Sequence, residues 1–197
     1  KLAEDVQIAT KFAQLTQQVL DNRKRQKYAV IVAVDVNGGF SADGGIPWYY
    51  KEDFAWFKEK TTGHICVMGR KTYDDINERL GDEGAESVLP NRRCFVVTSS
   101  PIPRDNATVV SSITEVDKYL SQEDIDNDRI VFFIGGGGIY SEGISKSDTA
   151  YITVVNKDVE AVDKFFPVTY LQEHFNPITN DTSVHPELAF TIWSRKH

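Results

Sequence analysis

One carboxylate lies among aromatic residues near the start of a predicted helix. The sequence predicts a helix over 51–60, in which Asp53, Phe54 and Phe57 fall within about one turn and can share a partly buried face. A carboxylate in such a place loses hydration, which raises its pKa and leaves it needing hydrogen-bond donors. Asp53 is therefore a candidate for binding a polar ligand. The alternative is a first-turn residue that interacts only with the helix dipole.

A second group of functional side chains follows a predicted strand at 64–68. Gly69, Arg70, Lys71 and Thr72 open the next helix, so backbone N–H groups, two cations and a hydroxyl meet at the positive end of a helix dipole. These groups suit a phosphate. The spacing differs from that of a P-loop, because Arg70 intervenes. An ordinary turn with basic surface residues is the alternative.

Four glycines, 135–138, stand between the predicted strand 130–134 and the residues Ile139 and Tyr140. Glycines at such a junction let the backbone approach a ligand, most often a pyrophosphate. Their spacing does not match the dinucleotide-binding fingerprint, so the run alone is a weak signal.

The elements that must position these groups alternate between strands and helices. The continuous β-branched run 28–34 predicts a strand buried on both faces of a sheet, and 94–98 and 151–155 are further strands. A helix is predicted near 114–121, a turn at 163–167, and an edge or hairpin strand at 190–194. The glycine-rich stretch 35–47 predicts a mobile loop and candidate lid. Together these predict an α/β sheet of mixed direction.

The first 26 residues form a separate amphipathic pattern. Ile8, Phe12, Leu15 and Val19 recur at helical spacing, which predicts a helical extension over 1–26 ahead of one domain over 27–197. This helix can pack on its own domain, pair with a copy of itself or bind another protein. Packing on its own domain or on a copy is the favoured interpretation.

Composition narrows the classes of partner. The chain has 197 residues, a formal net charge of -7 and a pI near 5.1, which argue against nucleic-acid and anionic-membrane partners. Cys66 and Cys94 lie in apolar strand-like runs, as reduced core thiols of a cytoplasmic protein do. The four histidines show no metal-ligand spacing, so no metal site is predicted.

Six motifs in register give the chain a resemblance to dihydrofolate reductase from about Tyr28 to the C-terminus. They are Ile46-Pro47-Trp48, Asp53 with its two phenylalanines, Met68 to Thr72, Leu89 to Arg92, Ile134 to Gly137 and Tyr151 to Thr153. The resemblance implies reduction of 7,8-dihydrofolate to tetrahydrofolate by NADPH on a mixed, mainly parallel eight-stranded sheet flanked by helices. It also implies methotrexate binding that depends on Asp53.

The resemblance assigns roles at the substrate side. Asp53, helped by Thr153, is similar to the residue that binds N3 and the 2-amino group of the pterin, and Trp48 to the residue that holds a water nearby. Arg92 should bind the α-carboxylate of the glutamate tail. The residues expected to line the folate channel are Ile31, Phe54, Phe57, Ile76, Leu89 and Ile134.

The resemblance also assigns the cofactor side. The pyrophosphate and the 2'-phosphate of NADPH should meet Gly69, Arg70, Lys71, Thr72, Thr98 and Ser99. The nicotinamide should lie against Ile46, Ile31, Ile134 and Tyr140, beside the turn Gly135, Gly136, Gly137, Gly138 and Ile139. Gly135-Gly136 resembles the family's cis peptide. Hydride would pass to pterin C6, and a water admitted by the 36–45 loop would protonate N5.

Several features depart from the family pattern. The 36–45 loop is about two residues longer than in a compact member, Gly138 replaces a common basic residue, and 81–87 is an acidic insertion. Two other functions stay open: a reductase of another pterin or a pyrimidine, and a folate-binding or scaffold protein working through its N-terminal helix. Arg92 argues against the first, because a substrate without a glutamate tail has no use for it. An intact Asp53 and phosphate cradle argue against the second.

Overall fold

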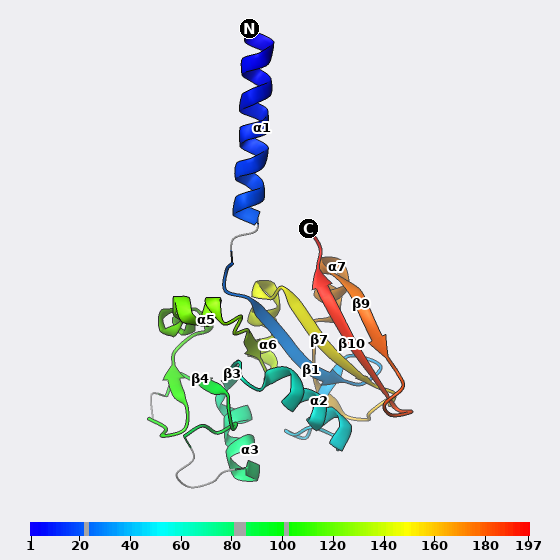
Figure 1. The fold of residues 1–197 in the computed structure, drawn as a ribbon. Coiled ribbons are helices and arrows are strands. Elements are labelled where there is room, and N and C mark those ends of the chain that lie inside the picture. The colour runs from blue at the N-terminus through cyan, green and yellow to red at the C-terminus, as the bar shows by residue number, and fades with distance from the viewer. Residues whose placement is uncertain (22–23, 81–85, 101–102) are drawn as a thin grey trace.

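The computed structural model describes residues 1–21, 24–80, 86–100 and 103–197, and it has an α/β architecture (Figure 1). The strands are Tyr28–Val34 (β1), Gly39–Ala42 (β2), Ile65–Gly69 (β3), Arg93–Val97 (β4), Thr108–Val110 (β5), Val131–Phe133 (β6), Thr149–Val155 (β7), Val162–Phe165 (β8), Phe175–Asp181 (β9) and Leu188–Arg195 (β10). The helices are Leu2–Asp21 (α1), Lys51–Thr61 (α2), Arg70–Leu80 (α3), Ile113–Val116 (α4), Gln122–Asp126 (α5), Gly137–Lys146 (α6) and Val168–His174 (α7), with a 3-10 turn at Asp117–Tyr119 (η1).

The main sheet has eight strands in the order β5-β4-β3-β6-β1-β7-β10-β9. Its neighbouring strands run parallel, except that β10 is antiparallel to both β7 and β9. The predicted mixed, mainly parallel eight-stranded sheet is confirmed. The predicted strand at 190–194 is also confirmed as half of a hairpin with β9, although β9 and not β10 forms the edge.

Strand β1 lies near the middle of this sheet and is buried on both faces, as its sequence predicts. Val30 and Val32 belong to a core cluster that includes residues of α4, α6 and α7. Ala29 and Ile31 belong to the opposite cluster, against which side chains of α2 and α3 pack. Because successive strand residues point to opposite faces, an apolar run without alternation fills both cores at once.

The two cysteines are neighbours across adjacent strands. Cys66 of β3 is in register with Cys94 of β4, and both are buried and free. The prediction of reduced core thiols is confirmed.

A second, two-stranded sheet corrects two predictions. The 163–167 segment was predicted as a turn and 35–47 as a loop without regular structure, but β2 pairs antiparallel with β8. The pairing is irregular, with two register shifts, so neither strand carries a clean alternating pattern. Glycine at position 39 permits the close approach, since a Cβ there would lie 2.4 Å from a methyl carbon of Val162.

The buried carboxylate of Asp35 holds the turn that leads into β2. Its Oδ1 accepts hydrogen bonds from the backbone N–H groups of Asn37 (2.9 Å) and Gly39 (2.8 Å), and its Oδ2 from that of Val159 (3.3 Å). This one side chain therefore ties the end of β1 to the start of β2 and to the segment before β8.

The predicted helix at 114–121 is divided into α4, η1 and the N-cap residue of α5. Ser112 caps α4, and Ser121 begins α5 in a capping box with Asp124. A serine that caps a new helix ends the previous one, which accounts for the interruption. Helices α6 and α7 and strands β5 and β9 were not predicted, and β9 is exposed along nearly all its length. Residues 81–85 of the acidic insertion lie outside the described residues.

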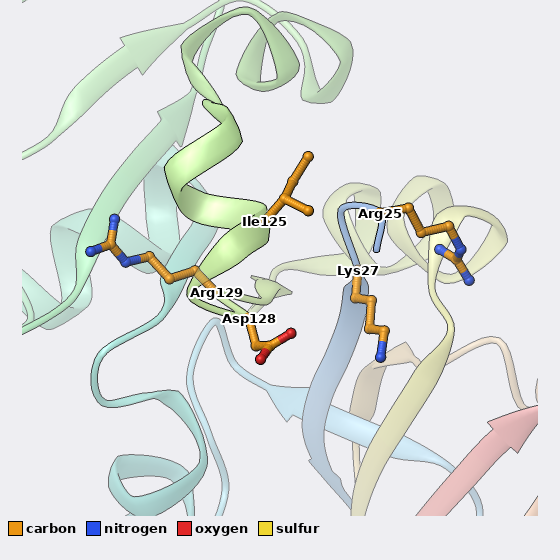
Figure 2. A pocket seen from close by; sticks show the side chains of 5 residues that line it. All are labelled: Arg25, Lys27, Ile125, Asp128 and Arg129. Carbon is orange, nitrogen blue, oxygen red and sulfur yellow. The ribbon is translucent and has the colours of Figure 1, made fainter. Parts of the chain in front are cut away.

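Helix α1 extends away from the sheet (Figure 1). Phe12 is 72% exposed and Val19 70%, so the helix does not pack on its own domain, and the other favoured alternative, pairing with a copy of the chain, stays a prediction. Residues 25–27 contact the domain beside 125–129, where Gln26 donates a hydrogen bond of 2.7 Å to the carbonyl of Arg129. A small hollow lies between these two segments, and Figure 2 shows the side chains that line it. No described helix is long and apolar enough to cross a membrane.

Candidate active site

A cavity of about 620 Å³ opens between α2, α3, β1 and the turn after β6. Its wall contains both the candidate substrate residues and part of the candidate cofactor residues. The predicted residues that line it are Ile31, Ile46, Trp48, Asp53, Phe54, Phe57, Gly69, Lys71, Thr72, Ile76, Leu89, Arg92, Ile134, Gly135, Gly136, Tyr140 and Thr153. The fold thus brings together every residue predicted for catalysis and substrate binding.

Asp53 lies in the first turn of α2, where its backbone N–H donates to the carbonyl of Tyr50 at 3.1 Å. Burial raises the pKa of its carboxyl above the ordinary value, and a hydrogen bond with Thr153 partly opposes that shift. Thr153 comes from β7 and is 1% exposed. The arrangement is a largely dehydrated acid with one protein donor, which leaves acceptor capacity for a ligand.

Tyr140 connects this acid to the cofactor side. Its hydroxyl lies 3.0 Å from the carbonyl oxygen of Ile31 and 2.9 Å from that of Ile134, so one buried group contacts both strands that border the cavity. Burial and then the charge of Asp53 raise the pKa of Tyr140. The hydroxyl therefore stays protonated and links the middle of β1 to the residue that follows β6.

Two indole N–H groups are buried in the cavity wall. The Nε1 atoms of Trp48 and Trp56 have no hydrogen-bond partner among the described residues. Trp56 packs its ring at 4.8 Å from that of Phe190, which fixes its orientation. A buried donor without a partner is costly, so these groups suit a polar ligand atom or a bridging water.

Arg92 stands in the wall near the ring of Phe57. Only 7% of it is exposed. Its Nε donates to the carbonyl of Pro90 at 3.0 Å and its Nη1 to the hydroxyl of Thr61 at 3.0 Å. It forms no ion pair with a described residue. A buried guanidinium held by neutral acceptors is positioned to receive a carboxylate.

The glycine turn and the start of α3 meet at the other end of the cavity. The N–H of Gly69 donates to the carbonyl of Gly135 at 2.8 Å, and the Gly135-Gly136 peptide is cis, as predicted. A Cβ on Gly136 would approach the hydroxyl of Thr72 at 3.9 Å, so the missing side chain keeps this surface open. Backbone donors, a hydroxyl and the ammonium of Lys71 fit a phosphate-bearing cofactor.

Six predicted cofactor residues do not line this cavity. Ile139 belongs to α6 and is buried in the core cluster that this helix shares with the sheet. Arg70 is exposed and forms an ion pair with Asp74 at 3.5 Å. The others are Thr98 and Ser99 after β4 and Gly137 and Gly138 at the start of α6. The helix turns the Ile139 side chain toward the sheet, so its predicted role at the cofactor stays a prediction.

The sequence analysis missed several wall residues, among them Ser41, Trp56, Lys58, Arg79 and Lys164. Trp56 lies three positions after Asp53, a spacing that places both on one helix face and could have indicated it. Lys58 and Arg79 could have been inferred from their helices. Lys164 gave no usable signal, since its segment was taken as a turn.

Comparison with known proteins gives a consistent result. Residues 27–194 match the model of the dihydrofolate reductase family. The chain is 35% identical to the dihydrofolate reductase of Bacillus subtilis over 138 residues, which cover 70% of this chain and 73% of that protein. It is 29% identical to dihydrofolate reductase type 1 of Escherichia coli, over 86% of this chain and 99% of the relative. A solved Enterococcus faecalis dihydrofolate reductase, complexed with NADP(H) and RAB-propyl, superposes with a TM-score of 0.71 at 25% identity, covering 87% of this chain and 97% of that one.

Proposed function

Because this chain belongs to the dihydrofolate reductase family, we propose that the cavity between α2, α3 and β1 is its active site. The chain is an oxidoreductase that reduces 7,8-dihydrofolate to 5,6,7,8-tetrahydrofolate with NADPH, by hydride transfer to pterin C6 and protonation of N5. When bound, NADPH supplies the hydride from C4 of its nicotinamide. The protein residues must orient the two rings, exclude water and control one proton.

Asp53 binds the edge of the pterin that carries N3 and the 2-amino group. Two donors on that edge match the two oxygens of one carboxylate, and Thr153 fixes the carboxylate from the other side. The indole of Trp48 holds a water beside them; its N–H is buried and has no partner in the described part of the chain, which supports this role. Asp53 does not need to touch N5, because a water admitted by movement of the 36–45 loop carries that proton.

The remaining wall orients the rest of the substrate. Apolar side chains of β1, α2, α3 and β6 enclose the ring system, and Arg92 pairs with the α-carboxylate of the glutamate tail. At the opposite end, Gly135 and Gly136 let the nicotinamide approach C6. Lys71 and Thr72 bind the phosphates with the backbone of α3, and Arg70 with Thr98 and Ser99 extends this cradle toward the adenosine 2'-phosphate outside the cavity wall.

The observation that carries this assignment is that a partly buried carboxylate and a buried guanidinium without an ion-pair partner among the described residues face one cavity. The test follows NADPH absorbance with dihydrofolate for the wild type and Asp53→Asn. Wild type should turn over, and the variant should lose about 10²–10⁴-fold in kcat/KM, the range for a positioned acid–base group. A variant that retains wild-type kcat/KM would remove Asp53 from the mechanism.

Thermal unfolding without ligands provides the control for this variant. Because the folded-state pKa of Asp53 is raised, its charged form costs stability above that pKa, and the cost is absent once pH falls below the unfolded value of about 3.9. Asp53→Asn should therefore melt no lower than wild type at pH 7, and the difference should shrink as the pH approaches 4. A lower melting temperature at pH 7 would mean that the activity loss reports damage to the fold.

Three wider assignments belong to this proposal. Residues 27–197 act as the catalytic domain and 1–26 as an extension outside it. The exposed apolar face of α1 serves self-association of the chain. The enzyme works in the cytoplasm, which the adjacent free thiols Cys66 and Cys94 support, since such a pair persists in a reducing compartment.

A further inference from the structure

Five cationic side chains line the cavity, and two of them border its glycine-rich end. Lys58, Arg79 and Arg92 belong to the side formed by α2, α3 and the segment before β4, whereas Lys71 and Lys164 flank the segment after β2. Neither Lys71 nor Lys164 forms an ion pair with a described residue. In a chain of net charge -7, two such cations at one end of a cavity indicate an anionic ligand.

Lys164 reaches this end through the two-stranded sheet. It is in register with Ser41 of β2, and Ser41 is 7% exposed and lines the same cavity. On the other side of the segment, the Nζ of Lys71 lies 2.8 Å from the place where a Cβ on Gly44 would stand. The two lysines therefore approach the 41–45 segment from β8 and from α3.

The starts of α3 and α6 present backbone donors at the same end. A Cβ on Gly137 would lie 3.8 Å from the Cζ of Phe40, so the first turn of α6 faces β2. At position 138 an added Cβ would meet nothing within 4 Å, and α6 has no basic side chain in its first turn. A pyrophosphate carries two negative charges, and the first turns of α3 supply Lys71 to the cavity wall, whereas Arg79 lies in the last turn of that helix.

We propose that Lys164 binds the pyrophosphate of NADPH and supplies the positive charge that Gly138 does not. The proposal rests on the proposed active site and adds a residue from the small sheet to it. The pyrophosphate is the favoured group, because Lys164 shares the cavity with Gly135 and Gly136. Arg70 and Ser99, expected at the 2'-phosphate, lie outside the cavity wall.

The test measures dissociation constants of NADPH and of NADH by fluorescence, without substrate. Lys164→Gln should weaken both cofactors by about fivefold at low ionic strength and leave their ratio unchanged, since both carry the pyrophosphate. The effect should shrink toward 1 M salt, where the Debye length is about 3 Å. Lys164→Arg should retain most of the affinity.

Two controls identify the position of the charge. Lys118→Gln removes an exposed lysine from η1, which is not part of the cavity wall, and should leave both dissociation constants unchanged. Arg70→Gln should weaken NADPH more than NADH. Wild-type affinity of Lys164→Gln for both cofactors, or a loss confined to NADPH, would overturn the proposal. A wild type that binds neither cofactor would overturn the proposed active site itself.

Discussion

At the scale of single residues, the site combines groups that are costly to bury. The carboxylate of Asp53 is dehydrated with one side-chain donor, and the indole N–H groups of Trp48 and Trp56 are buried without a described partner. Each arrangement costs stability in the free protein, and a ligand with matching donors and acceptors recovers it. The same residues therefore explain both the stability cost of building the site and its selectivity for ligands that supply the matching groups.

Arg92 provides the prediction that separates dihydrofolate from substrates without a tail. Arg92→Leu should raise KM for dihydrofolate about 10- to 100-fold, because a charge-assisted hydrogen bond contributes about 1.5–3 kcal/mol. A 6-methyl dihydropterin without the benzoyl-glutamate tail should be reduced by the variant as by the wild type. Steady-state kinetics with both substrates measure the difference.

Arg92→Lys is the companion variant, since it keeps the charge and loses the bidentate geometry. It should fall between wild type and Arg92→Leu for dihydrofolate. An equal loss with the tailless substrate would show instead that Arg92 acts through its bonds to Pro90 and Thr61, by supporting the wall.

At the scale of elements, close contacts between α6, β6 and the small sheet set the shape of the cofactor end. Gly143 of α6 faces Phe133 of β6 so closely that a Cβ would lie 2.5 Å from the ring. Asp35 holds the β2 turn against the segment before β8 through three backbone donors. These contacts hold Lys164 and the glycine turn in position, although the residues that make them are not expected to contact a ligand.

Two glycines of α6 form a matched pair for testing this packing. Gly143→Ala should lower the free energy of unfolding by about 1–3 kcal/mol, because the new methyl group overlaps a buried ring on a packed sheet. Gly138→Ala, in the same helix but open to space, should raise it by up to about 1 kcal/mol through helix propensity. Urea denaturation measures both changes. A stable Gly143→Ala would mean that α6 shifts easily along the sheet.

At the scale of the whole molecule, a catalytic sheet is joined to a helix that extends away from it (Figure 1). The apolar arc of α1 includes Ile8 and Leu15, which are 68% and 52% exposed. The junction is held by Gln26 and by an ion pair between Arg25 and Asp148 at 2.5 Å. No residue of α1 belongs to the sheet, to the core clusters on its two faces or to the cavity wall.

The exposed arc predicts concentration-dependent association of the full chain. Replacing Phe12 and Val19 by Glu should return the protein to monomers, because a charge in an apolar helix interface is costly. Gln14→Glu with Gln17→Glu adds the same charge to the opposite face and should leave association unchanged. Sedimentation velocity measures the result, and a wild type that stays monomeric at every concentration would refute the role of α1.

The sequence by itself determined the fold class, the order of the motifs and most of the cavity wall. Local spacing indicated the partly buried environment of Asp53 from one helical turn and the buried β1 from one apolar run, whereas the resemblance to dihydrofolate reductase implied the other residues of the wall. Contacts between distant segments required the tertiary structure. Thr153 follows Asp53 by a hundred positions, so spacing alone does not pair them; the resemblance implied the pair, and the sheet order explains how Thr153 reaches Asp53.

The same limit explains what was predicted wrongly. Strand β8 carries no alternating pattern because its pairing with β2 is irregular, so Lys164 could be placed only by that pairing. The sequence pattern did not predict the exposure of α1 either. An amphipathic pattern indicates that one face of a helix can be buried, but it does not specify the surface that covers this face. Periodicity reports the local conformation of a segment, whereas register and sheet order decide which segments meet.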